Sequence, residues 1–79
     1  MMQDEIELRD VALRAHGGYS ANIHINEFLA GSVVMRKDAI APEYYWQDES
    51  AADDLECWAW SQHGESFASI LPGLIESAA

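Results

Sequence analysis

The sequence predicts an α+β fold, with a three- to four-stranded antiparallel β-meander packed by one or two C-terminal helices. Three observations support this fold class. Apolar and polar residues alternate on both sides of Gly17 and Gly18, a helix-start signal stands at Ser50, and apolar residues recur at helical spacing towards the C-terminus. A chain of 79 residues has room for one small core, so we expect a single domain over residues 1–79.

The first half of the chain predicts a hairpin. Residues 4–16 also fit a helix that ends at Gly17 and Gly18, and the strand interpretation is favoured because alternation resumes after the glycines. The alternating apolar residues are Val11, Leu13, Ala15, Tyr19, Ala21, Ile23 and Ile25. Two such runs around a glycine pair are typical of a β-hairpin.

Two further strands are expected after the hairpin. Residues 27–31 would form a turn and residues 32–37 a third strand. Pro42 forces its predecessor towards extended geometry and suits only an edge strand or a strand start, so residues 43–47 would add a fourth strand at the edge of the sheet.

The strongest helix prediction covers residues 50–63, and this helix is expected to pack on the sheet. Ser50 and Asp53 are spaced as in a capping box, and Gly64 is a stop signal. Trp58 would lie in the core, on a stripe with Leu55, Ala59 and Gln62. Trp60 points away from Trp58, so it is expected on the flank of the helix or against a partner.

A second helix is expected within residues 65–79. Its helical spacing is carried by Phe67, Ile70, Leu71, Leu74 and Ile75. Pro72 and Gly73 interrupt this spacing, so the helix is expected to be kinked or broken there. Residues 1–3 and 77–79 are expected to be loose.

The charge balance bears most directly on function. Fourteen acidic residues against four lysines and arginines give a net charge of −10, which repels nucleic acid and anionic membranes and attracts basic protein surfaces. Acidity that only keeps the chain in solution is the alternative explanation. No apolar run approaches the roughly 20 residues of a membrane span, and a single cysteine fits a reducing compartment, so we expect a cytoplasmic protein. A homodimer or a tight partner would add to the small core.

Residues suited to catalysis are not arranged as a recognisable site. His16, His24, His63 and Cys57 show none of the spacings of a zinc site, and Cys57 is expected to be a small buried residue. The paired acids lack the glycine and the alternating oxygen ligands of a calcium loop. We therefore expect a protein that is not an enzyme and that has no catalytic residue, metal or cofactor.

The aromatic and acidic cluster of residues 44–60 is the predicted binding site. In an extended strand Tyr44 and Trp46 share one face and Tyr45 lies on the other, and tyrosine and tryptophan often anchor interfaces. The predicted partner-binding residues are Tyr45, Asp48, Glu49, Asp53, Asp54, Glu56 and Trp60.

The order of elements in this half of the chain resembles that of some small phage anti-CRISPR proteins. The resemblance rests on a strand, an acidic turn, a serine-started helix with Leu55, Glu56 and Trp58, then a glycine and a second helix. It implies an inhibitor in the host bacterial cytoplasm that binds a Cas effector subunit and blocks its access to target DNA with acidic side chains. The alternative is a small interaction subunit or antitoxin-like protein that binds through its aromatic surface.

Overall fold

The computed structural model describes residues 4–79 as one four-stranded antiparallel sheet and two helices, which confirms the α+β prediction. The strands are β1 (Ile6–Leu13), β2 (Tyr19–Ile25), β3 (Phe28–Met35) and β4 (Glu43–Trp46), in the spatial order β1-β2-β3-β4. The helices are α1 (Ser50–His63) and α2 (Phe67–Ala78).

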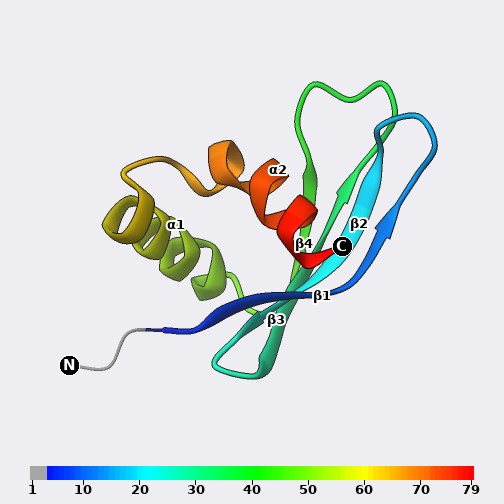
Figure 1. Cartoon of the computed structure of the whole chain (residues 1–79). Coiled ribbons are helices and arrows are strands. Elements are labelled where there is room, and N and C mark those ends of the chain that lie inside the picture. Colours follow the sequence, from blue (N-terminus) through cyan, green and yellow to red (C-terminus); the bar gives the residue numbers. More distant parts are fainter. Residues whose placement is uncertain (1–3) are drawn as a thin grey trace.

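Both helices lie on the same face of the sheet (Figure 1). α2 packs on the sheet at β1, and α1 packs against α2. We had expected the helix of residues 50–63 to be the one that covers the sheet. Instead α1 packs against α2, contributes Leu55 and Ala59 to the core, and places Trp58 at the edge of the core.

The strand interpretation of residues 4–16 is confirmed for Ile6–Leu13, but the strand is not regular. Arg9 pairs with Asn22 and Ala12 with Ser20, so two residues of β1 oppose one residue of β2. Asp10 has φ 55° within this bulge, and the Asn22 side-chain amide donates to its carboxylate at 3.0 Å. Before the bulge the side chains at even-numbered positions of β1 face the core, and after it those at odd-numbered positions do.

The expected turn at residues 27–31 is wrong. The chain turns at Asn26 and Glu27, whose φ angles are 51° and 71°, and β3 already begins at Phe28. Two central residues with positive φ define the hairpin turn that matches the twist of the strands, and asparagine tolerates that conformation. Asn26 also accepts from the Glu5 backbone N–H at 2.8 Å, which ties the start of β1 to the turn.

A glycine in β3 determines how β4 packs. Leu8, Ile23, Gly31 and Trp46 lie opposite one another across the four strands. A Cβ atom on Gly31 would stand 2.7 Å from the Tyr45 carbonyl oxygen and 2.9 Å from the Trp46 ring. Trp46 therefore occupies the space that a side chain at position 31 would need.

The two inward-facing aromatic residues of β4 connect the sheet to α2. The Tyr44 and Trp46 rings stack with centroids 5.2 Å apart, and the Phe67 ring lies 6.3 Å from that of Tyr44. Burial raises the pKa of Tyr44 to about 12, with smaller contributions from Tyr19 and Glu56. The prediction that Tyr44 and Trp46 share one face and Tyr45 the other is confirmed.

The second helix is not broken at Pro72 and Gly73, which was one form of the prediction. α2 is continuous through Pro72, although proline removes one helical hydrogen bond. Phe67, Leu71 and Ile75 are all buried and hold both halves of the helix on the core, while Pro72 lies on the exposed side. The helix extends to Ala78, so residues 77–79 are mostly helical rather than loose; the expectation for residues 1–3 falls outside the described residues.

Two glycine substitutions test this packing. Gly31→Ala should destabilise the protein by about 1–3 kcal/mol, because the new methyl group overlaps β4. Gly73→Ala should stabilise it by about 1 kcal/mol, because the position is helical and nothing lies within 4 Å of the added atom. Urea unfolding of both variants measures the difference, and equal effects would contradict the close approach of β3 and β4.

Candidate functional site

The charges of the protein are divided between its two layers. Residues 38–79 contain nine of the fourteen acidic residues and no lysine or arginine. All four lysines and arginines lie within residues 9–37. Arg9 pairs with Glu7 and Arg36 with Glu43, each at 3.1 Å. The helical layer is therefore strongly acidic, and the sheet carries charges of both signs.

The acidic run begins where β4 leads into α1. The Asp48 carboxylate accepts from the Ser50 backbone N–H at 3.0 Å, and this hydrogen bond lowers the pKa of Asp48 below its ordinary value of 3.8. The predicted capping box of Ser50 and Asp53 is wrong: the N-cap residue of α1 is Glu49, and its side chain makes no capping hydrogen bond. The Asp48 carboxylate instead accepts a backbone N–H at the helix start, which is the role that the prediction gave to the Ser50 hydroxyl.

α1 has one buried face and one face turned to solvent. Ala51, Leu55 and Ala59 are buried at intervals of four residues. We call the opposite side the α1 outer stripe; it consists of four exposed residues at helical spacing, Asp53, Glu56, Cys57 and Trp60. Trp60 is 59% exposed, as expected for a residue that points away from the core. Asp54 is also exposed, on the flank of the stripe.

Three positions on α1 differ from the sequence prediction. Cys57 is exposed rather than buried, Gln62 is exposed, and Trp58 is only half-buried at the edge of the core. The Trp58 ring packs edge-on against that of His63, with centroids 5.2 Å apart. The buried face is centred on Ala51, Leu55 and Ala59, so Trp58 lies at its margin rather than at its centre.

Glu56 also has a structural contact that the sequence did not reveal. Its carboxylate accepts from the Phe67 backbone N–H at 3.2 Å, at the start of α2. The Ser66 hydroxyl accepts from the Ser69 N–H at 3.3 Å in the same turn. Glu56 thus contributes negative charge to the stripe while it holds the two helices together. Eleven residues separate the two partners, so no local sequence pattern indicates the contact.

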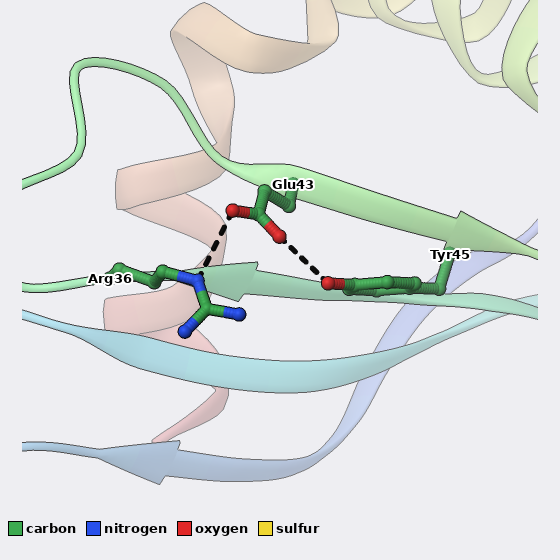
Figure 2. A network of polar contacts seen from close by, with 3 residues as sticks. All are labelled: Arg36, Glu43 and Tyr45. Atoms are coloured by element: carbon green, nitrogen blue, oxygen red, sulfur yellow. Dashed lines mark hydrogen bonds and ion pairs between the residues drawn. The ribbon is translucent and has the colours of Figure 1, made fainter.

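Tyr45 lies apart from the other predicted binding residues. It is 51% exposed on the face of the sheet away from the helices, where its hydroxyl donates to Glu43 at 2.7 Å. Figure 2 shows this network, in which Glu43 also accepts from Arg36. The structure therefore groups Asp48, Glu49, Asp53, Asp54, Glu56 and Trp60 around α1 and places Tyr45 on the opposite layer.

Other candidate sites are weaker. Within residues 4–79, no three histidine, cysteine or acidic side chains come together in a group that could hold a metal ion. A pocket of about 330 Å³ between the β1–β2 loop and α2 is lined mainly by apolar residues, with Arg14 and Glu76 as its charged members. In the part of the chain that the structure covers, no helix has the length and apolar character to cross a membrane.

Comparisons with protein-family models, with curated proteins and with solved structures found no match to this chain.

The lowered pKa of Asp48 predicts an effect of acid on stability. A carboxylate with a lower pKa in the folded state stabilises that state above its unfolded pKa, and this contribution is lost as pH falls through the folded pKa. Asp48→Asn keeps a hydrogen-bond acceptor but no titratable group, so its stability should fall less than that of the wild type below about pH 4. Urea unfolding across acidic pH would show this, and parallel curves for the two proteins would contradict it.

The two tryptophans of α1 should differ in their effect on stability. Trp58→Ala should cost about 2 kcal/mol, because the half-buried ring packs on the core and on His63. Trp60→Ala should cost less than about 0.5 kcal/mol, because its ring is mostly in solvent. Thermal and urea unfolding measure both values, and the reverse ranking would mean that the faces of α1 are assigned wrongly.

Proposed function

We propose that this protein is an acidic inhibitor that binds a basic surface of a nucleic-acid-handling protein and excludes nucleic acid from it. The proposal concerns a binding protein rather than an enzyme, and it assigns the contact to the α1 outer stripe with Asp48, Glu49 and Asp54. One observation carries it. The helical layer presents a run of acids around an exposed tryptophan, and residues 38–79 contain no lysine or arginine to neutralise them.

Electrostatics favour a partner that supplies the missing positive charge. Like charges that are not neutralised repel one another in the free protein, and the repulsion is relieved when a basic surface docks. Trp60 provides the apolar anchor that such a contact needs at its centre, next to the carboxylates of Asp53 and Glu56. The negative charge of the helical layer would also speed association with a basic groove that normally binds the phosphates of nucleic acid.

The specific target that we propose is a Cas effector subunit in the bacterial cytoplasm. Such a protein holds nucleic acid in a positively charged channel. An acidic helix in that channel would compete with the phosphate backbone without making any base contact. The resemblance in element order to small phage anti-CRISPR proteins supports this choice of target.

A second candidate function is docking through the sheet. Tyr45 and Leu29, 51% and 46% exposed, lie on the sheet face that no helix of residues 4–79 covers. The nearby charges of this face are paired, so a partner here would bind through aromatic and aliphatic contacts. This would be an interaction subunit whose binding depends little on salt.

Charge reversal separates the two functions. We expect the wild-type protein to inhibit DNA binding by a purified Cas effector complex, and we expect Asp53→Lys with Asp54→Lys to slow association about tenfold or more. Glu65→Lys with Glu76→Lys is the matched control, because it changes the net charge equally outside the stripe. Association rates measured at low and high salt should differ steeply for the wild type and little for the stripe variant.

A different outcome would favour the second function. If a captured partner is indifferent to salt and to the Asp53 and Asp54 reversals, and Tyr45→Ala abolishes binding, the acidic-inhibitor proposal fails. Loss of binding in Trp60→Ala alone, with no salt dependence, would make α1 a hydrophobic docking helix instead.

A further inference from the structure

β1 leaves an open edge on the sheet. It pairs with β2 on one side, and no strand within residues 4–79 pairs with its other side. The Glu5 carbonyl accepts from the Asn26 N–H at 2.8 Å, so Glu5 directs its backbone groups towards β2. The direction of the backbone N–H and C=O groups alternates along an antiparallel strand. The backbone groups of Glu7 and Arg9 therefore also point towards β2, and those of Ile6 and Leu8 point outward, away from the sheet.

We propose that two copies of this chain pair through the open edges of β1, antiparallel, with Leu8 opposite Leu8 of the second copy. The outward N–H and C=O groups of Leu8 then form a reciprocal pair of hydrogen bonds. In this register Glu7 lies opposite Arg9 of the second copy, and Arg9 lies opposite Glu7 of the second copy. The ion pair within each chain, 3.1 Å long, becomes a network of four charges across the interface.

Charge excludes the neighbouring registers. Pairing centred on Ile6, the other residue with outward backbone groups, would place Glu7 against Glu5 of the second copy. Registers centred on Glu7 or Arg9 would place like charges face to face, Glu7 against Glu7 or Arg9 against Arg9 of the second copy. The bulge at Asp10 ends the regular part of the edge, so the interface is confined to the start of β1.

Self-pairing at β1 also fits the distribution of charge over the molecule. Two chains of net charge −10 repel each other over most of their surface. β1 belongs to the part of the chain that contains all four lysines and arginines, and its Glu7 and Arg9 neutralise each other. The resulting sheet is continuous, and both pairs of helices lie on one face of it, because the two-fold axis runs perpendicular to the sheet.

A complementary charge swap tests this register. Sedimentation equilibrium over a range of concentrations should show a monomer–dimer equilibrium for the wild type. Glu7→Arg and Arg9→Glu should each weaken self-association about tenfold, because each creates like-charge pairs at the interface. An equimolar mixture of the two variants should restore dimerisation, because every cross-strand pair in the heterodimer then joins opposite charges.

Two controls make the result decisive. Glu65→Arg changes the net charge as Glu7→Arg does but lies outside β1, and it should dimerise like the wild type. The double variant Glu7→Arg with Arg9→Glu keeps each pair in swapped form and should also dimerise. A wild type that is monomeric at every concentration overturns the proposal, as does a mixture of the single variants that fails to form heterodimers.

Discussion

The packing of Trp46 over Gly31 is the constraint on which the rest of the fold depends. β4 has only four residues and stands at the edge of the sheet, so backbone pairing alone holds it weakly. The absent side chain at Gly31 lets the Trp46 ring lie against β3, and the stacked Tyr44 ring extends the aromatic surface to Phe67. Gly31 in β3 thereby determines the position of β4, the strand that precedes both helices.

The orientation of α1 follows from that arrangement. The Gln47 N–H donates to the Ala30 carbonyl at 2.8 Å, so the chain leaves the sheet at a fixed point just before Asp48. In the middle of α1, the Glu56 carboxylate accepts from the Phe67 N–H, and the Phe67 ring packs near Tyr44. These contacts at the start and in the middle of the helix help to determine which side is buried, and the outer stripe with Trp60 faces solvent as the consequence.

The sequence predicted the elements well and their details less well. Alternation and helical spacing identified all four strands and both helices, because these patterns depend on which residues face the core. The bulge at Asp10 was missed, although Ile6 and Leu8 stand at even positions and Val11 and Leu13 at odd ones. The Asn26 turn was missed because two apolar residues, Phe28 and Leu29, were not assigned to a strand. The exposure of Cys57 could not be predicted, since the rotation of α1 depends on its fit to α2.

The division of charge explains how so small a core tolerates so acidic a chain. The acids of α1 stay in solvent, where water screens their mutual repulsion, and Asp53 sits in the first turn, where the helix dipole favours a negative charge. The sheet, whose strands must approach one another closely, carries its charges as neighbouring pairs. Repulsion is thus kept away from the elements that form the core. The same division leaves the helical layer attractive to a basic partner, while the start of β1 presents Glu7 and Arg9 as an ion pair, so the two surfaces can bind different partners without competing for the same charge.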